Sequence, residues 1–171
     1  IGVVLALGVL LAAFGSLLAA GVPIVVSLCA MAVAYSLIHV GASIWQVHPT
    51  APMVAAMLGL GAGIDYALFV VTRHRNAITA GRDPEAACIR ALNTSGRAVL
   101  FAGATVIVAL LGLLVLGVSF LNGVAIASAV VVLVTMTAAV TLIPALLGMF
   151  GMKVLSRKER RRLEAEGPRD P

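Results

Sequence analysis

The sequence predicts an all-α integral membrane protein, folded as a bundle of five transmembrane helices. Of its 171 residues, 61% are hydrophobic and only 11% are charged, whereas a soluble domain carries roughly 25% charged residues. It contains apolar runs near the length of about 20 residues that crosses a bilayer as a helix. None of these runs alternates polar and apolar residues with a period of two, so a β-barrel is not supported.

The first two spans come from the N-terminal forty residues, which are about two span lengths and contain no charged residue. The chain must fold back once here, either at Phe14–Ser16 or at Gly21–Pro23. Glycine, serine and proline are tolerated within membrane helices, so the sequence alone does not choose between these breaks. We favour the first break, which gives spans of about 1–14 and 18–40 with the proline inside the second.

Three further spans are expected at about residues 51–72, 98–117 and 123–147. Phe120 to Asn122 is predicted to form the turn between the last two. Together, the five spans make residues 1–152 the transmembrane bundle.

All twelve basic residues lie in two segments, 73–97 and 153–171. By the positive-inside rule both segments face the cytoplasm, the first as a connector and the second as a basic tail. Five crossings then alternate consistently, which predicts a multi-pass protein. The arginines expected to determine topology and to meet anionic lipid headgroups are Arg73, Arg75, Arg97, Arg160, Arg161 and Arg162.

The connector contains a short interfacial helix over residues 83–93. Asp83 can cap it, and Pro84 suits its first position. Neither basic segment has an aromatic-interleaved or groove-fitting element, so nucleic acid is not an expected partner. The histidines lie near span ends and are expected to be interfacial or solvated; they are His39, His48 and His74.

One carboxylate, Asp65, stands inside the span that reads GLGAGIDYALFVVT. It precedes Arg73 by eight residues, which places it roughly 12 Å inside the cytoplasmic boundary. An Asp near the centre of a membrane helix costs roughly 2.5–3.5 kcal/mol to insert. Such a group must turn toward a partner or a wet cavity. We interpret Asp65 as a carboxyl that gains and loses a proton; the alternative is a carboxyl that only links two helices by hydrogen bonds.

Tyr66 follows directly, about 100° around the helix. Its hydroxyl can donate or accept a hydrogen bond, and we expect Asp65 and Tyr66 each to find a partner on a facing helix. The alternative for Tyr66 is a packing aromatic. Gly59, Gly61 and Gly63 are expected to pack helices around this pair, since a GxxxG spacing is typical of tight helix contact.

Enzymatic chemistry is not expected. The glycines of GLGAG follow no strand, so they do not form a phosphate-binding loop. An intramembrane aspartyl protease needs a second acid, and no second acid lies within the predicted spans. Cys29 and Cys88 lie in no metal or redox spacing. We therefore predict no cofactor and no metal, with protons as the coupling ion.

The stretches GIDYALF, SGRAV and LIPALLG, followed by the basic VLSRKERRRL, resemble the MMPL family of the resistance-nodulation-division (RND) transporters. The resemblance implies proton-driven export of lipids or other hydrophobic molecules across the bacterial inner membrane. It also implies two pseudo-repeated halves of six transmembrane helices, each with an Asp-Tyr proton relay on its fourth helix. Asp65 and Tyr66 match that pair, and the chain then corresponds to about helices two to six of the N-terminal half.

The chain departs from the family pattern because it has no second Asp-Tyr pair, no first helix and no large outer domain. The implied partners are membrane lipids, a hydrophobic cargo, and a second half supplied by a longer polypeptide or a homo-oligomer. A non-transporting scaffold, assembly or sensor module on the same bundle stays open. A channel is a further alternative, although no span shows a polar stripe to line a pore.

Overall fold

The computed structural model describes residues 8, 17–42, 49–150, 155 and 161. All secondary structure within these residues is helical. The elements in chain order are α2 (Leu17–Gly41), α3 (Ala51–Thr79), α4 (Pro84–Ala91), a π-helical turn (Leu92–Gly96), α5 (Arg97–Gly112), a 3₁₀ turn (Leu113–Leu116) and α6 (Ser119–Phe150).

Four helical stretches in the described part are long and apolar enough to cross a membrane. They are Ala19–Gly41, Ala51–Thr79, Pro84–Leu116 and Ser119–Met149. The predicted class, an all-α multi-pass membrane bundle, is therefore confirmed. The expected first span, 1–14, lies outside the described residues, and the number of five helices stays a prediction.

Helix α2 runs without a break through Pro23. The break at Gly21–Pro23 is therefore excluded, and the proline lies inside the helix as favoured. Ser27 Oγ donates to the Pro23 carbonyl oxygen at 2.7 Å. This bond satisfies the serine hydroxyl within its own helix.

Two helix boundaries differ from the expected spans. Helix α3 continues seven residues past Thr72, to Thr79, because its buried face continues past the first arginines. The turn expected at Phe120–Asn122 is helix instead, and the chain reverses at Gly117 and Val118. Gly117 adopts a φ of 67°, a left-handed conformation that glycine adopts without steric cost.

The segment between α3 and α5 is mostly helical. Asp83 caps α4 as expected, because its carboxylate accepts a hydrogen bond from the Glu85 N–H at 3.3 Å. Pro84 occupies the first helical position, and Ala87 and Ala91 are buried. A π-helical turn then leads directly into α5, so that Pro84–Leu116 is one helical stretch.

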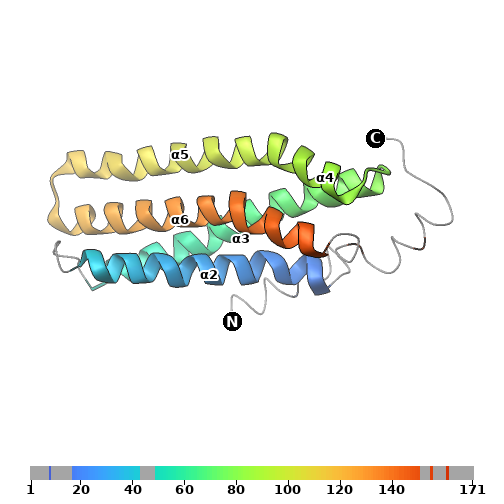
Figure 1. The fold of residues 1–171 in the computed structure, drawn as a ribbon. Coiled ribbons are helices and arrows are strands. Elements are labelled where there is room, and N and C mark those ends of the chain that lie inside the picture. Colours follow the sequence, from blue (N-terminus) through green and yellow to red (C-terminus); the bar gives the residue numbers. More distant parts are fainter. Residues whose placement is uncertain (1–7, 9–16, 43–48, 151–154, 156–160, 162–171) are drawn as a thin grey trace.

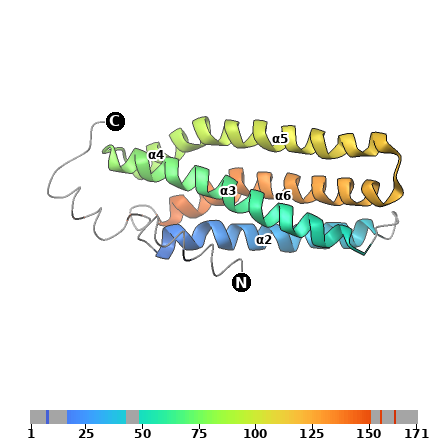
Figure 2. The ribbon, with the colours of Figure 1, turned by 180° about the vertical axis from the view of Figure 1, so that it is seen from behind.

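Helix α6 lies at the centre of the bundle. It packs against α2, α3 and α5. Figure 1 shows α6 between α5 and α2, and Figure 2 shows α3 crossing the opposite side of the bundle diagonally. The main hydrophobic core combines buried side chains of α2, α3, α5 and α6, whereas a second cluster joins α2, α3 and α6 toward the other end.

Glycines on α3 allow it to approach two helices at once. A Cβ on Gly59 would overlap the Val131 side chain of α6, and one on Gly63 would lie 2.9 Å from Ser27 Oγ of α2. The same Gly63 position is 3.4 Å from Thr135 Cγ2 of α6. Gly59 and Gly63 thus lie where α3 comes close to side chains of α2 and α6, and their role in packing helices around Asp65 and Tyr66 stays a prediction.

Gly63→Leu is expected to destabilise the bundle by about 1–3 kcal/mol, because extra carbon atoms in a well-packed interface force neighbouring side chains and backbone to move. Gly112→Leu is the matched control, since nothing lies within 4 Å of a Cβ at that exposed position. Unfolding in detergent by heat or denaturant measures both variants. Equal stability of the two would contradict the tight packing of α3.

Candidate functional site

Asp65 is the central residue of the 29-residue helix α3. A helix of this length is roughly 43 Å long, longer than a hydrocarbon core of roughly 30 Å. Asp65 therefore lies near mid-depth when α3 spans the bilayer. Its side chain is exposed within the chain, because Gly63, two residues earlier and about 200° around the helix, faces α2 and α6.

The side of α3 that carries Asp65 is uncovered along the length of the helix. Its exposed residues recur at spacings of three and four, which places them along one side. We call this side the open stripe; it consists of Val54, Leu58, Gly61, Asp65, Phe69, Thr72 and Asn76. Asp65 is the only ionisable member of the stripe. The Thr72 hydroxyl donates to the Leu68 carbonyl oxygen at 2.7 Å, so it is satisfied within its own helix.

None of the described residues forms a hydrogen bond or an ion pair with the Asp65 carboxylate. The facing-helix partner expected for Asp65 is thus not among them. Tyr66 is half-buried and packs against the main core cluster. The two side chains therefore diverge, with Asp65 on the open stripe and Tyr66 on its edge toward the core.

The third predicted glycine differs from the other two. Gly61 lies on the open stripe, and a Cβ there would meet nothing within 4 Å. Among the described residues, no helix packs against Gly61. Its lack of a side chain instead leaves the helical turn before Asp65 bare on the exposed side.

The arginines of the connector do not share one environment. Arg73 and Arg97 are exposed, whereas Arg75 is only 6% exposed. Arg75 falls on the buried side of α3, and its role in topology and headgroup contact stays a prediction. Arg161 is exposed; Arg160 and Arg162 lie outside the described residues.

His74 is fully buried, so the expectation that it is interfacial or solvated is wrong. His39 is exposed as expected, and His48 lies outside the described residues. The burial of His74 could have been predicted from the spacing of apolar and small residues in the sequence. The buried positions Gly63, Ala67, Val71, His74 and Ile78 follow spacings of four, four, three and four, a periodicity that continues beyond the first arginine.

The sequence model of the MMPL family matches residues 1–168. The chain belongs to the MMPL family. Membrane protein YdfJ of Bacillus subtilis is 38% identical over 161 residues, which are 94% of this chain and 22% of that protein.

Two other MMPL relatives are named as exporters. The trehalose monomycolate exporter MmpL3 of Mycobacterium tuberculosis is 36% identical over 146 residues, 85% of this chain and 16% of that protein. The mycolic acid-containing lipids exporter MmpL11 of Mycolicibacterium smegmatis is 35% identical over 149 residues, 87% of this chain and 16% of that protein. The chain thus spans between 16% and 22% of the length of these three relatives.

His74→Ala is expected to cost about 2–5 kcal/mol of stability, the range for truncating a large buried side chain and leaving a cavity. Arg73→Ala is the matched control, because its side chain is the exposed neighbour on the same helix. It is expected to change stability by about 0.5 kcal/mol or less. Denaturation of the two variants in the same detergent compares them, and a smaller loss for His74→Ala than for Arg73→Ala would contradict the buried placement.

Proposed function

We propose that this chain is part of a proton-motive-force-driven exporter of lipids or other hydrophobic molecules in the bacterial inner membrane, with Asp65 and Tyr66 as its proton relay. The observation that carries this proposal is the position of Asp65. It is a carboxylate at the middle of an apolar helix, on the stripe that its own bundle leaves open. Ionisable groups at such depth require a partner or water and mark ion or proton pathways.

The open stripe is the surface on which a complementary helical unit docks. A longer polypeptide supplies this second half, or a second copy of the chain does. The proposal is supported by the length of the three relatives, of which the chain spans 22% or less. The bare turn at Gly61 supports it too, since small residues let helix backbones approach closely in a membrane.

Proton binding at Asp65 changes how the two units attract each other. The charged carboxylate attracts a donor on the facing helix, and protonation weakens that attraction. One elementary charge that moves down a potential of 100 mV releases roughly 2.3 kcal/mol, about the size of a helix-packing difference. With segment 73–97 and the basic tail in the cytoplasm, protons enter from the outer side and leave on the cytoplasmic side.

Hydrophobic cargo is the substrate class that best fits the relatives' names. Two of them are named for export of trehalose monomycolate and of mycolic acid-containing lipids. We extend to this protein only the shared chemistry, a molecule with long apolar chains, and propose transport of such a molecule.

Asp65→Asn in the full-length protein is expected to abolish proton-coupled export while leaving insertion and stability unchanged. Asparagine keeps the shape but cannot carry the charge, and Asp65 has no structural partner among the described residues. Asp83→Asn is the matched control, because it makes the same chemical change at the α4 cap, where asparagine caps as well as aspartate. Proton flux into proteoliposomes and the lipid profile of the complemented deletion strain measure the effect. Continued export by Asp65→Asn would favour a non-transporting scaffold, assembly or sensor module.

Tyr66→Phe is expected to lower proton flux without lowering stability. The half-buried ring keeps its packing against the core, and only the hydroxyl is lost. Tyr66→Ala is expected to lower both, since it also removes the ring. If Tyr66→Phe transports at the full rate, Tyr66 is a packing aromatic and not part of the relay.

A further inference from the structure

The open stripe of α3 differs chemically on the two sides of Asp65. Seven and eleven residues before Asp65 it carries Leu58 and Val54, whereas seven and eleven residues after Asp65 it carries Thr72 and Asn76. All four side chains are exposed within the chain. Seven and eleven residues are close to two and three full helical turns, each within about 20°, so the four positions lie nearly in line with Asp65. One half of the stripe is therefore apolar and the other half polar.

The two polar side chains have hydrogen-bonding groups to spare. Thr72 uses its hydroxyl proton in the 2.7 Å bond to the Leu68 carbonyl oxygen, and the lone pairs of its oxygen remain acceptors. None of the described residues forms a hydrogen bond with the Asn76 side-chain amide, which can both donate and accept. Together with the Asp65 carboxylate, these groups offer water a series of partners along one side of the helix.

The polar half of the stripe has the length of one leaflet. Along α3, Thr72 lies roughly 10 Å and Asn76 roughly 16 Å beyond Asp65, against roughly 15 Å for half of a hydrocarbon core. With Asp65 near mid-depth, Asn76 therefore lies at the edge of the hydrocarbon. Water molecules that bond to one another at about 2.8 Å bridge the interval from Asp65 to Thr72 with about three members.

We propose that this polar half of the open stripe is the proton exit, on which Thr72 and Asn76 position a chain of water between Asp65 and the cytoplasm. The inference rests on the proposed relay at Asp65. The protonated Asp65 carboxyl gives its proton to the first water and becomes a carboxylate, and the last water releases one proton to the cytoplasm. Thr72 and Asn76 are positioning residues, because they hydrogen-bond to the chain of water and neither gains nor loses a proton.

The apolar half of the stripe makes this path one-sided. Leu58 and Val54 offer no hydrogen-bonding side chain, and Gly61 has no side chain at all. Water that follows α3 from the outer side therefore finds no side-chain partner on the stripe before Asp65. Proton entry consequently requires polar groups of the unit that faces the stripe, whereas proton exit requires only α3 and water.

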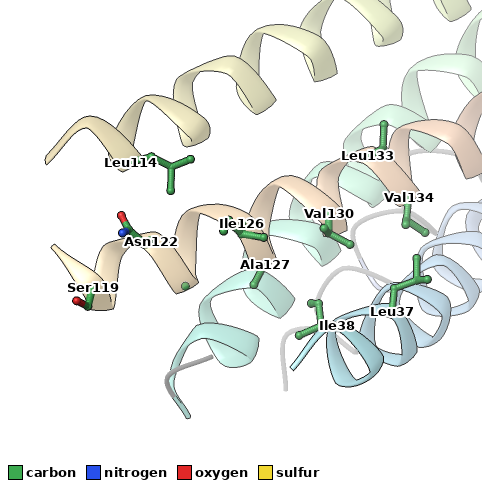
Figure 3. Close-up of a pocket in the computed structure, with 12 residues that line it drawn as sticks. Leu37, Ile38, Leu114, Ser119, Asn122, Ile126, Ala127, Val130, Leu133 and Val134 are labelled. Carbon is green, nitrogen blue, oxygen red and sulfur yellow. The ribbon is translucent and has the colours of Figure 1, made fainter. Parts of the chain in front are cut away.

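A hollow of about 540 Å³ between α2 and α6 is a different candidate for a water path. No residue of α3 lines it, and its polar side chains, Ser119 and Asn122, lie near the α5–α6 turn (Figure 3). Every other lining residue is apolar or glycine. The hollow thus offers water no polar route toward Asp65, and the stripe of α3 is the better candidate.

Cysteine accessibility in the full-length protein tests where water reaches the stripe. Single cysteines are introduced into a background in which Cys29, Cys88 and any other native cysteine are replaced by alanine. A small charged thiosulfonate reacts with thiolates, which form where water reaches the sulfur. Two matched pairs at equal distances from Asp65 are compared: Leu58→Cys with Thr72→Cys, and Val54→Cys with Asn76→Cys. In inside-out vesicles we expect the second member of each pair to react several-fold faster than the first.

Proton flux into proteoliposomes tests the two side chains themselves. Thr72→Val keeps the shape but removes the oxygen, and it is expected to lower flux several-fold without changing stability in detergent. Thr72→Ser keeps the oxygen and is expected to retain most of the flux, and Asn76→Leu is expected to lower it. Thr137→Val on α6 is the matched control, because Thr137 is also exposed and donates to the Leu133 carbonyl oxygen at 2.7 Å. It is expected to change nothing.

Two outcomes would overturn the proposal. One is equal reactivity within both cysteine pairs, and the other is full proton flux through both Thr72→Val and Asn76→Leu. Asp65→Asn, measured alongside, separates this inference from the proposed function. If Asp65→Asn stops the flux while the other two variants conduct fully, the relay stands and the exit is wrong. If Asp65→Asn itself conducts fully, the relay is wrong, and the cysteine pairs still decide whether water enters this half of the stripe.

Discussion

The close packing of α3 against α2 and α6 is the constraint on which the rest of the structure depends. Gly59 and Gly63 have no side chains where Val131, Ser27 and Thr135 come closest, so the backbone of α3 packs directly against these side chains of α2 and α6. A helix that buries one side must expose the opposite one. The glycine pair therefore also decides that Asp65 lies on the open stripe.

Several hydroxyls in this bundle form a hydrogen bond within their own helix, whereas the Asp65 carboxylate forms none with the described residues. Hydroxyls of Ser27, Thr72 and Thr135 each donate to a carbonyl oxygen one turn earlier in their own helix. Such bonds need no neighbouring helix. A carboxylate has no proton to donate and cannot use this device, so it requires a donor, water or a proton from outside its helix. Asp65 on the open stripe therefore depends on a group outside α3.

The fold was more predictable than the surroundings of individual side chains. Continuous apolar runs identified the helices, and Asp83 followed by Pro84 identified the start of α4. The expected span ends at Thr72, before Arg73 and Arg75, whereas helix α3 continues to Thr79. Arg73 is exposed and Arg75 is buried. An α-helix turns about 100° per residue, so residues two positions apart lie on nearly opposite sides of it.

The sequence by itself determined that the chain is a helical membrane protein and that one acid lies within its expected spans, because length, hydropathy and composition are local properties. Its resemblance to the MMPL family lay in the stretches GIDYALF, SGRAV and LIPALLG. Only the tertiary structure decided which side of each helix is covered. It separated Gly61 from Gly59 and Gly63, enclosed His74, and formed the hollow beside Asn122. Those outcomes depend on contacts between helices that are far apart in the chain, and the contacts follow from shape complementarity, which no single segment encodes.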